Sequence, residues 1–171
     1  MVKFKKEYTN SSINNKKYFF FSELEKYRDL LKVYKTNCYF IFDDIQFKKL
    51  NIKSNKIKVI SLKKFNRFLS LKKNFLEFEC GTSFYKINNL LKKKKIKINF
   101  NYLNYNEKSF FQLLADDIAC SNANEIKIIL DKIKFIKIIK NNQIVKIIKK
   151  KQILKKLNQK KLILTFGIKI N

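Results

Sequence analysis

Glycine and proline are almost missing from this chain, and their scarcity limits how the backbone can turn. The 171 residues include no proline and two glycines, Gly81 and Gly167. Glycine supplies positive φ angles at low cost and proline fixes φ, so these two residues mark most tight turns in proteins. The turns of this chain must therefore be made mainly by Asn, Asp, Ser and Lys.

Charge is the second extreme feature. The chain has 40 Lys and Arg residues against 13 Asp and Glu residues, a net charge of +27, which first suggests a nucleic-acid partner. However, only Arg28 and Arg67 are Arg, and the dominance of Lys, Asn, Ile, Phe and Tyr is typical of strongly AT-rich coding. Since Arg gives the bidentate recognition that Lys lacks, we interpret the Lys excess mainly as compositional bias, with nonspecific nucleic-acid attraction.

Several functional classes are disfavoured by composition. The chain has no His, so it has no imidazole base or ligand, and its cysteines (Cys38, Cys80 and Cys120) form no CxxC pair. The paired carboxylates Asp43–Asp44 and Asp116–Asp117 lack a third ligand at useful spacing, so we predict no metal site. No apolar run is long enough for a signal segment or a membrane span, and we expect a soluble cytoplasmic protein.

The first part of the chain predicts a β-α-β-β unit. Residues 17–21 and 57–62 are predicted strands, and the continuous apolar run 38–42 is predicted as a central strand buried on both faces. Ser22 and Glu25 have the spacing of a capping box, which predicts the start of a helix. The side chains expected to face the core from this helix are Leu24, Tyr27, Leu31 and Tyr34.

The second part predicts strands mixed with helices. Residues 75–80 are a predicted strand, followed by a turn at 81–83 and a helix through Leu91 that Lys92 to Lys95 close with favourable positive charge. Asn141–Asn142 predicts a tight hairpin, because Asn tolerates positive φ. The other predicted elements are a strand at 96–100, a short helix at 109–114, hairpin strands at 133–139 and 143–148, and a terminal strand at 161–170.

The strand, turn and helix from Phe78 to Leu91 resemble a recurring element of the two-lobed FAD-binding domains of the vanillyl-alcohol-oxidase type. Residues 18–25 resemble the first strand and helix of those domains. The resemblance covers roughly residues 15 to 171 and implies an α+β fold. It implies an N-terminal extension at 1–16, a small β-α-β-β lobe at 17–70, a larger antiparallel-sheet lobe with helices at 71–171, and an absent C-terminal substrate domain.

Within that superfamily, the sequence is most similar to the UDP-N-acetylenolpyruvoylglucosamine reductase (UDP-N-acetylmuramate dehydrogenase) family. Residues 119–125 resemble the flavin loop of that family, and residues 162–169 resemble the strand that completes its FAD domain. The resemblance implies FAD between the lobes, NADPH as hydride donor, and a nucleotide-sugar enolpyruvyl ether as substrate in peptidoglycan precursor synthesis. The FAD-binding residues that it implies are Gly81, Thr82, Ser83, Ser121, Asn122 and Ala123.

The sequence also departs from that family. Asp43 to Gln46 stand where a Gly-rich phosphate loop is expected, and their carboxylates would repel a pyrophosphate. Asp116–Asp117 replace paired glycines of the third loop, and residues 149–159 lack a Tyr-Arg-Asp-Ser motif, so no catalytic residue is assigned. We therefore expect an eroded flavoprotein reductase, with a partner chain supplying the substrate domain if it is active.

Two alternatives stay open. Gly81 can be a simple strand–helix turn glycine, with Thr82 or Ser83 as a helix cap. The whole chain can instead be a basic RNA-binding protein, such as a ribosomal protein of an AT-rich genome.

Overall fold

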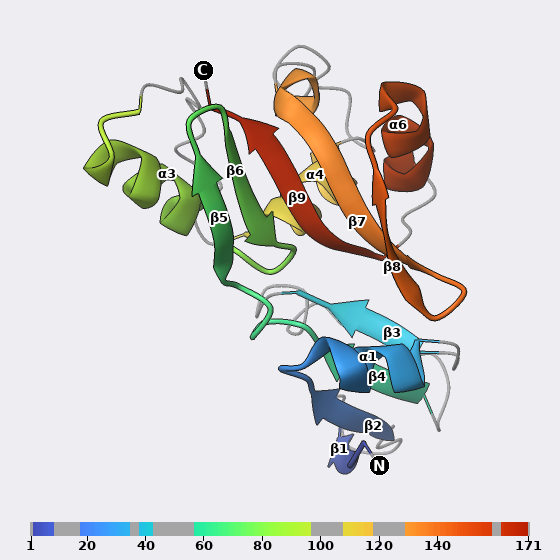
Figure 1. The fold of residues 1–171 in the computed structure, drawn as a ribbon. Helices are drawn as coiled ribbons and strands as arrows, with labels where there is room; N and C mark the ends of the chain where they lie inside the picture. Colours follow the sequence, from blue (N-terminus) through green and yellow to red (C-terminus); the bar gives the residue numbers. More distant parts are fainter. Residues whose placement is uncertain are drawn as a thin grey trace. The chain divides into compact units, whose positions relative to one another are not determined.

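The computed structural model describes residues 2–8, 18–34, 38–42, 57–96, 108–117, 129–158 and 162–170. The chain divides into two units, Met1–Lys64 and Phe65–Asn171, and each contains its own β-sheet (Figure 1). This is the mixed α+β fold that the sequence predicts.

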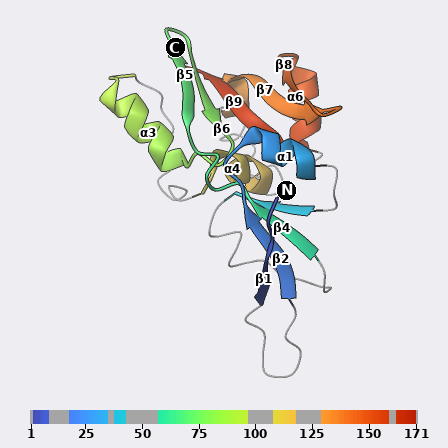
Figure 2. The same ribbon diagram turned by 60° about the horizontal axis from the view of Figure 1, so that its bottom comes forward.

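The first unit is a four-stranded sheet in the order β1-β2-β4-β3 with a helix, α1, on one face (Figure 1). Strands β2, β4 and β3 are parallel, and β1 is antiparallel to β2 (Figure 2). The predicted order β-α-β-β is confirmed, and an unpredicted strand, β1, precedes it. The elements are β1 (Lys5–Tyr8), β2 (Tyr18–Glu23), α1 (Tyr27–Val33), β3 (Cys38–Ile41) and β4 (Ile57–Ser61).

The predicted capping box is wrong. Ser22 and Glu23 belong to strand β2, where they pair in register with Ile60 and Ser61 of β4. The strand pairing therefore overrides the local capping signal, and α1 begins at Tyr27 with no side-chain cap. The apolar face of the helix is shifted accordingly. Leu24 is buried as predicted, whereas the buried residues of α1 are Leu30 and Val33, and Tyr27, Leu31 and Tyr34 are half-buried.

The predicted central position of residues 38–42 is also wrong. Strand β3 lies at the edge of the sheet with β4 as its neighbour, and the Tyr39 side chain is 58% exposed. Of the three parallel strands, the middle one is β4, in which Val59 and Ile60 are fully buried. An apolar run alone does not distinguish these positions, because aromatic side chains also suit a half-buried edge strand.

The second unit is an antiparallel five-stranded sheet in the order β5-β6-β9-β7-β8. The predicted terminal strand is confirmed as β9, and it lies at the centre of the sheet. Helix α4 lies behind the sheet in Figure 1, and its Phe110 ring lies 4.9 Å from the rings of Phe78 and Phe166. The elements are β5 (Phe68–Lys72), β6 (Phe75–Glu79), α3 (Phe84–Lys93), α4 (Phe110–Asp117), β7 (Ile133–Lys140), β8 (Gln143–Ile147), α6 (Lys150–Asn158) and β9 (Ile163–Lys169).

The local predictions in this unit are largely confirmed. Asn141 and Asn142 join β7 to β8 with φ angles of 50° and 61°, the positive values that a tight hairpin requires. Helix α3 follows the turn at 81–83 and has Lys92 and Lys93 in its last turn. Strand β5 and helix α6 were not predicted. Of the strand predicted at 96–100, Ile96 is not in a strand and the remaining residues lie outside the described ranges.

Candidate functional site

The turn between β6 and α3 contains Gly81, Thr82 and Ser83. The amide of Gly81 donates to the Phe65 carbonyl at 2.8 Å, and the amide of Thr82 donates to the Glu79 carbonyl at 3.0 Å. These two amides are therefore engaged within the protein and do not form an open phosphate cradle. The φ angle of Gly81 is not positive, so the backbone conformation itself does not require glycine there.

The turn lies beside the amino-terminal ends of two helices, α3 and α4. Ser83 caps α3 by accepting a hydrogen bond from the Lys86 amide at 3.3 Å, and Ser109 accepts one from the Gln112 amide at 3.1 Å at the start of α4. Ser83 and Ser109 also pair in an isolated antiparallel bridge. Since helix amino termini carry partial positive charge, this place favours a ligand atom with partial negative charge.

The hydroxyl of Thr82 is the unusual group of this turn. The residue is fully buried, and its Oγ1 is the one buried side-chain oxygen or nitrogen in the described part of the chain that has no hydrogen-bond partner. Its carbonyl accepts from the Phe110 amide at 3.0 Å, so its backbone is tied to the start of α4. An unsatisfied buried hydroxyl costs about 1–3 kcal/mol, which a ligand group bonded to it would offset.

A buried carboxylate lies directly before the turn. Glu79 is fully buried, and Arg67 contacts both of its oxygens, with Nη2 at 2.7 Å from Oε1 and Nε at 3.1 Å from Oε2. The backbone amide of Arg67 also donates to Oε2 at 2.9 Å. Sequence reasoning missed this pair, although the presence of Arg in a chain so dominated by Lys was an available signal.

Cys80 does not act as a nucleophile in this arrangement. Burial and the adjacent Glu79 carboxylate raise the pKa of the Cys80 thiol well above its ordinary value. The thiolate is the reactive form of cysteine, so a buried, protonated thiol is chemically inert.

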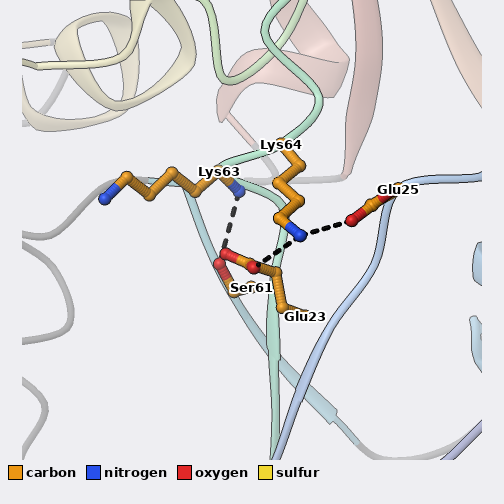
Figure 3. Close-up of polar contacts among 5 residues, drawn as sticks. All are labelled: Glu23, Glu25, Ser61, Lys63 and Lys64. Atoms are coloured by element: carbon orange, nitrogen blue, oxygen red, sulfur yellow. Dashed lines mark hydrogen bonds and ion pairs between the residues drawn. The ribbon is translucent and has the colours of Figure 1, made fainter.

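The carboxyl ends of the parallel strands in the first unit form a second possible ligand edge, because parallel sheets bind ligands there. Glu23 ends β2 and Ser61 ends β4 (Figure 3). Lys64 Nζ lies 3.2 Å from Glu23 Oε2 and also contacts the Glu25 carboxylate, which lowers the pKa of Glu25 and raises that of Lys64. The Lys64 ammonium is thus engaged by two carboxylates within the protein, so it is not presented to a phosphate.

The remaining predicted residues are placed as follows. Ser121, Asn122 and Ala123, like Asp43 and Asp44, lie outside the described residues. Asp116 and Asp117 are the last two residues of helix α4.

Within the described ranges, no cluster of three or more Cys, Asp or Glu side chains could hold a metal ion. Among the same residues, no helix has the length and apolar character to cross a membrane.

Comparison with solved structures identifies the fold. Two crystal forms of alkyldihydroxyacetonephosphate synthase match with TM-scores of 0.65 and 0.63, at 12% and 13% sequence identity. The matches cover 89% and 93% of this chain. This chain therefore shares their mixed α+β fold, with two β-sheets and few helices. This result confirms the predicted fold class.

The same comparisons also set the limits of the likeness. This chain spans about a third of the matched proteins, 34% and 32% of their lengths. No protein-family model matches the sequence, and no curated protein matches it. Membership of the UDP-N-acetylenolpyruvoylglucosamine reductase family therefore stays a prediction from the sequence.

Proposed function

We propose that this chain is the flavin-binding domain of an FAD-dependent oxidoreductase. The observation that carries the proposal is the fold, which matches over 89% of the chain at a TM-score of 0.65. The unpartnered Thr82 hydroxyl, between the starts of α3 and α4, supports the turn at 81–83 as the place of contact.

The described residues fit an uncharged part of FAD better than its phosphates. The amides of Gly81 and Thr82 are already engaged, whereas the Thr82 hydroxyl can bond to a hydroxyl or carbonyl of the ribityl chain or ring. Ser121, Asn122 and Ala123 are proposed as the second contact, on the sequence resemblance alone. When bound, FAD supplies the hydride chemistry, and the protein supplies orientation and exclusion of water.

The specific reaction that we propose is the NADPH-dependent reduction of a UDP-N-acetylglucosamine enolpyruvyl ether to UDP-N-acetylmuramate. The support is the sequence resemblance at residues 119–125 and 162–169. In this proposal a partner chain provides the substrate-binding lobe and the acid that protonates the substrate carbon. The RNA-binding alternative gains no support from the fold comparison.

The test is a titration of the purified chain with FAD, followed by the visible absorbance and fluorescence of the flavin. Thr82→Val removes the hydroxyl and keeps the shape, so we expect about 2–10-fold weaker FAD binding, the value of one neutral hydrogen bond. Thr82→Ser, which keeps a hydroxyl, is the matched control and should bind within about twofold of the wild type.

The same variants separate a ligand role from a structural role. Because Thr82→Val removes an unsatisfied buried group, it should leave the free energy of unfolding equal or higher. A wild-type chain that binds no FAD at saturating concentration would disprove the proposed function.

A further inference from the structure

We propose that Arg67 is a positioning residue for the turn at 81–83, which it holds in place through its hydrogen bonds to the buried Glu79 carboxylate. The inference rests on the proposed function, because it assigns to Arg67 the task of fixing Thr82 for the ligand. Nothing in the resemblance or in the fold comparison points to this residue; its contacts and the composition of the chain do.

The Arg67 guanidinium contacts both oxygens of the Glu79 carboxylate. Three nitrogen atoms of Arg67 donate to Glu79, two from the guanidinium and one from the backbone amide, at 2.7 to 3.1 Å. The Arg67 side chain is 58% exposed, whereas the Glu79 side chain is fully buried. A buried carboxylate must be satisfied at both oxygens, so this side chain has one allowed position while Arg67 holds it.

Backbone hydrogen bonds link Arg67 and Glu79 to the turn at 81–83. Glu79 and Gly81 donate their amides to the carbonyls of Arg67 and Phe65, so residues 65–67 run alongside 79–81 like an added strand. The Glu79 carbonyl in turn accepts from the Thr82 amide at 3.0 Å. Movement of Glu79 would therefore shift the residue that presents the unpartnered hydroxyl.

Position 67 is one of the two positions in this chain that have Arg. All other basic residues of the chain except Arg28 are Lys. We therefore expect Lys at any position where either basic residue would serve, and Arg67 departs from that expectation. A Lys ammonium is a point charge and cannot contact both carboxylate oxygens in the planar arrangement of a guanidinium. Arg28 shows the contrast, since it is 73% exposed and its Nε lies 3.9 Å from Asp29 Oδ1.

The experiment measures FAD dissociation constants and the visible circular dichroism of bound flavin for Arg67→Lys, with Arg28→Lys as the matched control. We expect about 2–10-fold loss of affinity for Arg67→Lys, no more than Thr82→Val loses, and an altered flavin spectrum, since Arg67 acts through the Thr82 hydroxyl. Arg28→Lys should stay within about twofold of the wild type. Affinities are measured under conditions where each free protein is fully folded, so that lost stability alone does not change them.

A double-mutant cycle with Thr82→Val decides whether Arg67 acts through the turn. If it does, adding Thr82→Val to Arg67→Lys should weaken FAD binding less than it does in the wild type, because the hydroxyl is already misplaced. Additive losses, or an Arg67→Lys affinity equal to the wild type, would overturn the inference and leave the proposed function intact. Absence of FAD binding by the wild type would disprove both the role of Arg67 and the proposed function.

A second variant covers the case in which Arg67→Lys does not fold. Arg67→Gln combined with Glu79→Gln leaves no buried charge unpaired, so this pair should fold. This double variant lacks the charged contacts between residues 67 and 79. We expect it to lose as much FAD affinity as Arg67→Lys and to be non-additive with Thr82→Val in the same way. Wild-type affinity in this pair would count against a positioning role.

Discussion

Gly167 offers a sharp test of the core of the second unit. It lies in the central strand β9, paired in register with Phe135 of β7, and the Phe135 ring lies across it. A Cβ added at Gly167 would come within 2.2 Å of Phe135 Cε1 and 2.4 Å of Cζ. Carbon atoms in contact normally lie about 3.5–4.0 Å apart, so in Gly167→Ala the ring must retreat by more than about 1 Å.

The ring has little freedom to retreat. Phe135 is 5% exposed, its ring lies edge-on to Phe75 at 5.7 Å, and Lys146 Nζ lies 4.1 Å from its centroid. Overpacking of this kind costs about 1–3 kcal/mol, and loss of the aromatic contact adds about 0.5–1.5 kcal/mol. Alanine gains about 0.5–1 kcal/mol over glycine within a strand. We therefore expect Gly167→Ala to destabilise the protein by about 2 kcal/mol.

The assay is urea unfolding followed by circular dichroism, in the wild-type background and in Phe135→Ala. Because Phe135→Ala removes the atoms that clash, Gly167→Ala should there change the free energy of unfolding by less than about 0.5 kcal/mol, or raise it. An equal cost in both backgrounds would show that the ring is not what excludes a side chain at Gly167.

Three further predictions follow from local geometry. Gly81→Ala should leave stability unchanged or raise it by up to about 1 kcal/mol, because the φ angle is not positive, and should weaken FAD binding; a marked loss of stability would argue for a packing role instead. Asn142→Val should destabilise the hairpin by about 1–2 kcal/mol in urea unfolding, because a β-branched residue resists positive φ, whereas Asn142→Gly should not. The stability difference between wild type and Lys64→Gln should shrink as the pH falls through the lowered pKa of Glu25, since protonation ends the ion pair. The raised pKa of Lys64 predicts the converse loss at high pH, and a difference that is constant from acid to neutral pH would contradict the pairing.

The correct sequence predictions rest on local signals. Asn141–Asn142 marks a hairpin because few residue types accept positive φ. The predicted strand 161–170 is mainly apolar, as expected for β9, which is buried at every position except Lys169. The strand, turn and helix from residue 75 to 91 combine an apolar strand, a glycine and a helical period in one short stretch. In each case the signal and the structure lie within about ten residues of each other, as typical turn and strand patterns do.

The failures involve partners that are distant in the sequence. The capping box at Ser22 failed because β2 continues along β4, which lies almost forty residues later. Strand β3 is at the edge because β4, not β3, is the neighbour of β2. The contact between Arg67 and Glu79 likewise depends on residues 65–67 pairing with 79–81. The sequence pattern within either stretch does not indicate which segment it pairs with.

The two glycines now have different explanations. Among the described residues the positive φ angles belong to Lys95, Asn141 and Asn142, so this chain adopts left-handed backbone without glycine. Neither Gly81 nor Gly167 has a positive φ, so the backbone conformation does not require glycine at either position. Phe135 accounts for Gly167. Gly81 is half-buried and lies next to Thr82, whose hydroxyl has no hydrogen-bond partner, and we propose that a flavin approaches the backbone closely at this position.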